Sequence, residues 1–109
     1  MKIPDKIKIG GHWVNVVRVE SFDGHDGMAG QAKHTKMEIL LAEKCYGDEQ
    51  AESNVAVGLL HEIVHHVDSL YQTGLKERQV DTLSEGLFQV LRDNELDFRL
   101  ADKRAESRE

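Results

Sequence analysis

The 109-residue sequence contains one cysteine, one proline and few aromatic residues, and these shortages already exclude several classes of protein. Because Cys45 is alone, no internal disulfide framework can form, and a reducing compartment suits the chain. No apolar run approaches membrane-spanning length, and residues 1–5 lack the hydrophobic segment of a signal peptide. We therefore expect a cytoplasmic protein that does not enter a membrane.

Positive charge is also scarce, with 14 lysine and arginine residues against 20 aspartate and glutamate residues. The net charge of −6, with no basic cluster, argues against nucleic acid or an anionic membrane surface as the main partner. A chain of this length and composition predicts one soluble globular domain with a modest core. We place this single domain in residues 1–96 and expect the charged residues 97–109 to form a flexible tail.

Strand patterns fill the first half of the chain. Alternating isoleucines predict a strand over residues 3–9, and a valine-rich run predicts a second over residues 12–20, with two glycines between them as a hairpin signal. Shorter runs at 29–33 and 37–41 predict two further strands. We expect these segments to form a small antiparallel sheet of three or four strands.

Two helices are predicted in the second half. Asp48 is a candidate N-cap for a first helix that ends at about Tyr71, before Gly74. Its apolar residues fill one broad arc, which predicts a mostly buried helix with a narrow polar strip. A second helix is expected from about Leu75 to Asn94, with an apolar arc centred near Leu87. The expected fold class is therefore α+β.

The first helix carries the strongest functional pattern, H-E-x-x-H at residues 61–65. Residues four apart lie on one face of a helix, so His61 and His65 can present two imidazole nitrogens to one ion. Glu62 is turned away from that ion, yet its carboxylate can reach a water molecule on it. Two neutral imidazoles, one basic carboxylate and an open position are typical of a hydrolytic zinc site. Solvated surface histidines are the alternative, which the buried character of the helix disfavours.

A catalytic zinc site needs a third protein ligand, and no histidine follows residue 66. Asp68 lies two turns from the first histidine and should miss the ion, although it could orient a ligand imidazole. On the second helix, Glu77 borders the apolar arc, and Asp81 shares its face one turn later. Glu85 should point at solvent. We favour Glu77 as the ligand, with Asp81 as its rival.

The spacing H-E-x-x-H followed by E-x-x-x-D resembles the gluzincin arrangement of zinc peptidases. In that clan, two histidines and a glutamate on a later helix bind zinc, and an acid four residues beyond the glutamate supports a ligand histidine. The resemblance implies that His61, His65 and Glu77 are zinc ligands. It also implies that Glu62 is the catalytic base and that Asp81 supports a ligand histidine.

Residues 54–94 also resemble small metallopeptidases encoded by phages and prophages, through the runs L-H-E-I-V-H and L-S-E-G-L-F-Q-V-L-R-D-N. Those proteins are similar to the minimal zincin domain of the ImmA/IrrE group. The resemblance implies a zincin-like fold, in which the helix that carries H-E-x-x-H packs on a small sheet. Only 11 residues separate His65 from Glu77, so a tight turn near Gly74 must bring Glu77 back.

These patterns predict a zinc-dependent metallopeptidase that hydrolyses a peptide bond with metal-activated water and Glu62 as general base. A peptide or protein substrate could pair with the sheet edge near residues 29–33 or 37–41. The alternative is a non-proteolytic, metal-binding module of zincin fold that acts as a regulatory or interaction protein of a phage or its host. A purely structural zinc site is disfavoured, because no cysteine or fourth histidine is placed to close the coordination.

Overall fold

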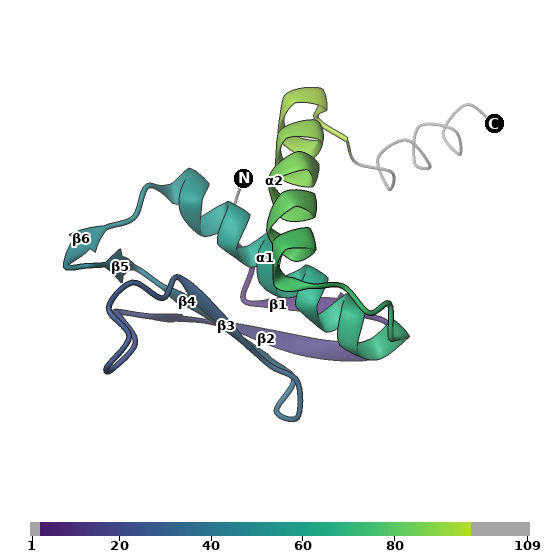
Figure 1. Cartoon of the computed structure of the whole chain (residues 1–109), viewed down its shortest axis with the longest axis horizontal. Helices are drawn as coiled ribbons and strands as arrows, with labels where there is room; N and C mark the ends of the chain where they lie inside the picture. The colour runs from purple at the N-terminus through teal and green to yellow at the C-terminus, as the bar shows by residue number, and fades with distance from the viewer. Residues whose placement is uncertain (1–2, 97–109) are drawn as a thin grey trace.

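The computed structural model describes residues 3–96, which form strands followed by two helices (Figure 1). The elements are β1 (Lys6–Ile9), β2 (His12–Val19), β3 (Gly30–Lys33), β4 (Glu38–Ala42), β5 (Lys44–Cys45), β6 (Asp48–Glu49), α1 (Glu52–Tyr71) and α2 (Glu77–Asn94). The expected α+β class is confirmed. The tail expected at residues 97–109 lies outside the described residues.

The main sheet is mixed, so the expected antiparallel sheet is wrong for its central pair. Its strand order is β1-β2-β4-β3, in which the two outer pairs are antiparallel and β2 runs parallel to β4. Burial explains this order, because Ile39, Leu41 and Ala42 of β4 are all buried, whereas no residue of β3 is. The more apolar strand of the β3–β4 hairpin therefore lies inside, and β3 forms the edge.

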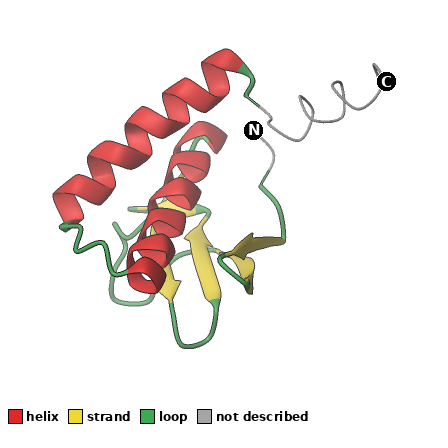
Figure 2. Ribbon diagram, turned by 90° about the vertical axis from the view of Figure 1, so that its right-hand side faces the viewer, coloured by secondary structure: helices red, strands yellow, loops and turns green. Residues whose placement is uncertain are grey.

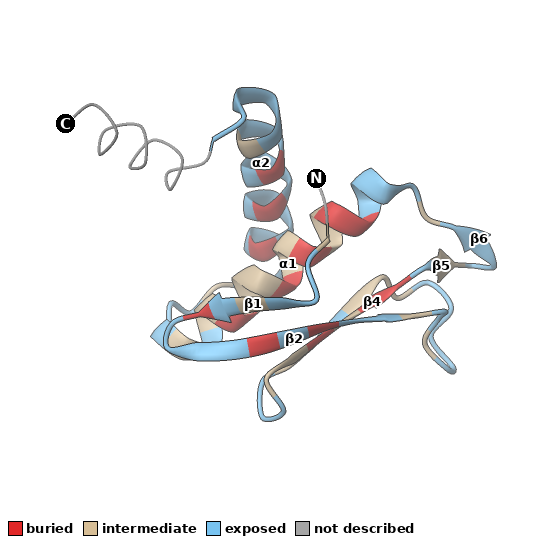
Figure 3. Ribbon diagram, turned by 180° about the vertical axis from the view of Figure 1, so that it is seen from behind, coloured by how far each residue is buried: buried red, intermediate tan, exposed pale blue. Residues whose placement is uncertain are grey.

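Helix α1 lies across one face of this sheet, and α2 packs against α1 on the side away from the sheet (Figure 2). Buried residues gather between the sheet and α1, with a second buried stripe between the helices (Figure 3). The core comprises residues from both layers: Ile9, Val14, Val16, Ile39, Leu41, Val55 and Leu59. The opposite sheet face is open to solvent, as the 60% exposure of Trp13 shows. Within residues 3–96, neither helix combines the length and the apolar character needed to cross a membrane.

The first helix begins later than the sequence suggests. Asp48 pairs with Cys45 in the short β5–β6 ladder, and Ala51 occupies the N-cap of α1 without a side-chain hydrogen bond. The expected end of α1 is confirmed, since Gln72 adopts a left-handed conformation after Tyr71. Helix α2 begins two residues after the expected Leu75, where the backbone N–H of Lys76 donates to the Gln79 side chain.

Helix α2 is also rotated about its axis relative to the expected apolar arc. Its buried stripe is Val80, Ser84 and Phe88, whereas Leu87, the expected centre, is 44% exposed. At about 100° per residue, this stripe is turned by roughly 60° from the direction of Leu87. The hydroxyl of Ser84 donates to the Val80 carbonyl oxygen at 2.7 Å, so a serine can be buried at the contact with α1.

Candidate metal centre

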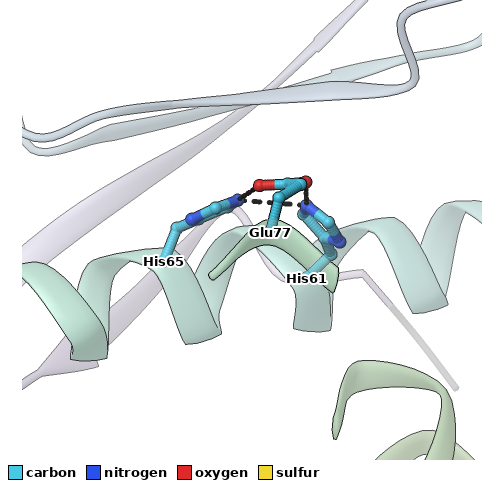
Figure 4. A group of neighbouring side chains, drawn as sticks. All are labelled: His61, His65 and Glu77. Carbon is cyan, nitrogen blue, oxygen red and sulfur yellow. Dashed lines mark hydrogen bonds and ion pairs between the residues drawn. The ribbon is translucent and has the colours of Figure 1, made fainter. Parts of the chain in front are cut away.

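The side chains of His61, His65 and Glu77 converge on one point between the two helices (Figure 4). The Nε2 atoms of the two histidines are 3.1 Å apart. Glu77 Oε1 lies 2.8 Å from His61 Nε2, and Glu77 Oε2 lies 2.9 Å from His65 Nε2. The structure thus brings together the three residues that the sequence suggests as ligands.

Asp81 contacts the opposite nitrogen of one of these imidazoles. Its Oδ1 lies 2.9 Å from His61 Nδ1, which fixes an Nδ1–H tautomer for a neutral ring and leaves the lone pair on Nε2. That lone pair faces the Glu77 carboxylate and the His65 ring. Asp81, the rival for the third ligand position, therefore lies behind His61 rather than at the point of convergence.

The donor set fits a divalent metal ion of the zinc type. Tetrahedral bonds of about 2 Å place donor atoms about 3.3 Å apart, close to the separations seen here. Two imidazole nitrogens and a carboxylate that face one another at 2.8–3.1 Å are held together either by ring protons or by a cation, and one divalent ion would satisfy all three groups at once. Among residues 3–96, only His61, His65 and Glu77 form such a group of three or more ligating side chains.

The loop between the helices returns Glu77 to α1. The Asp68 carboxylate accepts hydrogen bonds from the Thr73 hydroxyl and, at 3.0 Å, from the backbone N–H of Leu75. These hydrogen bonds lower the pKa of Asp68, so its carboxylate is ionised and holds the turn tightly. Within residues 3–96, Asp68 forms no hydrogen bond with His61 or His65, the rings that it was expected to help orient. Its hydrogen bonds in the structure shape the loop.

Glu62 is buried beside the converging side chains, with only 5% of its surface exposed. Within the described part of the chain, its carboxylate has no hydrogen-bond or ion-pair partner. Burial raises the pKa of Glu62 to about 7, against the lowering effect of His61 and with smaller contributions from the Glu77 and Asp81 charges. A carboxyl group with this pKa can both accept and release a proton near neutral pH.

Gly30, at the start of the edge strand β3, makes room for Glu62. A Cβ atom at Gly30 would lie 3.0 Å from Glu62 Oε2 and 3.2 Å from the carbonyl oxygen of Leu40. Any larger residue would therefore displace the carboxylate or the strand. Sequence reasoning missed this glycine, because only the sheet order places it over α1.

A pocket of about 480 Å³ adjoins the site. It is bounded by the start of β3, the first half of α1 and one side of α2, through Met28, Ala29, Gly30, Gln50, Asn54, Val57, Gly58, His61, Glu62, Glu77, Asp81 and Glu85. Gly58 lies in this wall, where the lack of a side chain leaves room. Glu85 is exposed, as expected from the sequence, and it also borders the open side of this pocket.

His66, the third histidine of α1, faces away from the site and is 1% exposed. Its Nε2 lies 3.3 Å from the Glu38 carbonyl oxygen, which can only accept, and its Nδ1 lies 3.4 Å from Nδ1 of His34. Burial lowers the pKa of His66, in spite of the bond to Glu38, so the neutral ring is favoured. This contact joins α1 to the turn between β3 and β4, and no sequence pattern indicated it.

No family model, no curated protein and no solved structure matches the chain.

Proposed function

We propose that this protein is a zinc-dependent metallopeptidase of the gluzincin type, with a zincin-like fold related to the small phage and prophage peptidases that the sequence resembles. The observation that carries the proposal is the convergence of His61, His65 and Glu77 next to the buried carboxyl group of Glu62. Structural zinc sites close all four positions with protein ligands. Three protein donors leave the fourth position open, as hydrolysis requires.

The residues of the chain divide the chemistry between them. A zinc ion held by His61, His65 and Glu77 would supply a Lewis acid able to lower the pKa of water to about 7. Glu62 accepts a proton from the attacking water molecule and passes it to the leaving amine. Asp81 holds the His61 ring in the tautomer that presents Nε2.

The substrate backbone is proposed to bind along β3. Within residues 3–96, this strand pairs with β4 on one side only, so its other edge offers backbone groups to an extended peptide. Gly30 places the start of this strand beside Glu62, since a Cβ atom added to Gly30 would lie 3.0 Å from Glu62 Oε2. A peptide paired with β3 would therefore carry one of its bonds past Glu62.

Metal content and peptide cleavage test this proposal together. The purified protein should contain one zinc ion per chain, and Glu77→Ala should lose most of it. Glu62→Gln should keep zinc and lose hydrolysis by about two to four orders of magnitude, which is the usual contribution of a general base. Glu95→Gln, at the far end of α2, is the matched control and should behave like the parent.

Two results would contradict this assignment. Cleavage at the parent rate by Glu62→Gln would remove Glu62 from the mechanism. Zinc binding without cleavage of any member of a broad peptide library would favour the alternative, a non-proteolytic zincin-fold module that acts as an interaction protein.

A further inference from the structure

One wall of the pocket beside the metal centre is a row of carboxylates on α2. Glu77, Asp81 and Glu85 follow one another at intervals of four residues, so they lie on successive turns of one face. Glu62 adds a fourth carboxylate from α1. Of the described residues that line the pocket, His61 alone has a side chain that can carry a positive charge. The pocket is therefore strongly negative.

Three of these four acids have roles in the proposed reaction, and Glu85 has none. Glu77 contacts both ligand histidines, Asp81 contacts His61, and Glu62 is the proposed base. Within residues 3–96, Glu85 forms neither an ion pair nor a side-chain hydrogen bond. Even with Glu62 protonated, the three carboxylates on α2 exceed the charge of one divalent ion, so the pocket stays negative.

A second metal ion does not explain the row. Among residues 3–96, His61, His65 and Glu77 are the one group of three or more ligating side chains whose donor atoms all lie within 4.8 Å of one another. Glu77 and Glu85 are separated by about 12 Å along the helix axis, at about 1.5 Å per residue. The charges are spread along a wall, as suits an elongated organic cation, and not gathered at a point.

A second feature of the pocket, besides its row of acids, indicates a ligand site. Glu62 is more than nine-tenths buried, lines the pocket and has no partner among the residues that the structure describes. Met28 and Val57 add apolar surface to the same lining. The long stem of a lysine or arginine side chain can cover such surface while its charged end reaches a carboxylate.

We propose that this pocket binds a positively charged group of the peptide substrate, with Glu85 as the specificity-determining residue. The inference rests on the proposed peptidase function and names its substrate class: peptides with lysine or arginine next to the cleaved bond. The same chemistry is offered by a free peptide amino terminus, which the experiment separates from a side chain.

The test compares peptides that differ only in charge at one position. Peptides acetylated at the amino terminus and amidated at the carboxyl terminus carry arginine or citrulline, and lysine or norleucine, next to the cleaved bond. The zinc-loaded parent should show a kcat/KM about twofold to fivefold higher for each cationic member, as expected of one exposed ion pair. Glu85→Gln should bring this ratio close to one, Glu85→Arg should reverse it, and Glu95→Gln should retain it.

Binding to an inactive protein gives a second readout that does not depend on turnover. Zinc-loaded Glu62→Gln should bind the arginine peptide more tightly than the citrulline peptide, and high salt should weaken this preference. The additional change Glu85→Gln should remove it. A neutral peptide with a free amino terminus should bind no better than its acetylated form if a side chain is the ligand. Tighter binding of the free amine that depends on Glu85 would assign the pocket to the amino terminus and overturn the side-chain assignment.

The failures of the two proposals can be told apart. Cleavage without a preference for cationic peptides, or a preference that survives Glu85→Gln, overturns the role of Glu85 and leaves the peptidase standing. If no peptide is cut although zinc is bound, the peptidase proposal fails, and equal binding of the charged and neutral peptides then overturns the pocket assignment as well.

Discussion

Replacement of Glu62 by glutamine should stabilise the metal-free protein at alkaline pH. The pKa of this buried carboxyl group is raised from 4.5 to about 7. One pKa unit corresponds to about 1.4 kcal/mol, so burial of the ionised group lowers the free energy of unfolding by about 3 kcal/mol. Glutamine has the same shape and no charge to bury, so the variant avoids this loss.

The raised pKa of Glu62 determines the pH range in which the stability of the parent changes. Between pH 4.5 and about pH 7, the native protein holds a proton that the unfolded chain has released. Stability of the parent therefore falls as the pH rises through this window. The advantage of Glu62→Gln over the parent should grow by about 2 to 3 kcal/mol between pH 5 and pH 8. At about 4 °C per kcal/mol, this corresponds to a difference of about 10 °C in Tm.

Urea unfolding at both pH values, with EDTA present, measures this difference. The variant Glu95→Gln replaces an exposed carboxylate at the end of α2 and should follow the parent at both pH values. An advantage of Glu62→Gln that is equal at pH 5 and pH 8 would show that the carboxyl group is not buried in an uncharged form. The burial of the proposed base would then be refuted.

Three further predictions concern the surroundings of the site. Asp81→Ala should weaken zinc binding about 10-fold to 100-fold in a competition assay with a chelator, because the His61 ring loses its orienting carboxylate. Gly30→Ala should lower kcat/KM, because the added Cβ would lie 3.0 Å from Glu62 Oε2. In the control Gly86→Ala, the added Cβ meets nothing within 4 Å, so this change in α2 should stabilise the fold by about 1 kcal/mol in urea unfolding. Because the pKa of His66 is lowered in the folded protein, the unfolded chain binds a proton at this histidine more readily below pH 6.5, and the parent loses stability as the pH falls. His66→Gln should reduce this loss in the same urea assay.

The parts of the fold that depend on local patterns could be predicted from the sequence. The four strands of the main sheet and both helices follow from the alternation and the helical periodicity of apolar residues. The two-residue strands β5 and β6 are too short for any periodicity to show. Pairing of Asp48 with Cys45 in that ladder also overrides the N-cap signal at Asp48, because a local preference gives way to a partner elsewhere in the chain.

The parallel pairing of β2 with β4 could not be predicted from a single sequence. Adjacent strands in the chain most often pair with each other, and a hairpin pattern at residues 30–42 is compatible with either of its strands next to β2. The choice depends on which strand loses more solvent contact, and this is decided by α1, which covers Ile39 and Leu41. The order then places β3 at the edge, beside Glu62.

The spacing of the candidate ligands was visible in the sequence because it is a property of single helices. His61 and His65 are one turn apart on α1, and Glu77 and Asp81 are one turn apart on α2. The rotation of α2 about its axis could not be predicted in this way, because apolar periodicity alone directs Leu87 towards α1. The structure instead buries Ser84 there, with its hydroxyl bonded to the Val80 carbonyl oxygen.

This rotation of α2 explains why the acids on it meet the site. At about 100° per residue, Glu77 lies roughly 20° from the direction of Ser84, and Glu85 lies roughly 100° from it. Measured from Leu87, the same two residues lie about 80° and about 160° away, which would place Glu85 almost opposite the packed face of the helix. Burial of a small hydrogen-bonded serine lets the acidic side of α2 border the pocket, and it leaves Leu87 44% exposed. In this orientation α2 buries less apolar surface than it could, and its carboxylates border the pocket. Hydrophobic patterns alone cannot predict such an orientation.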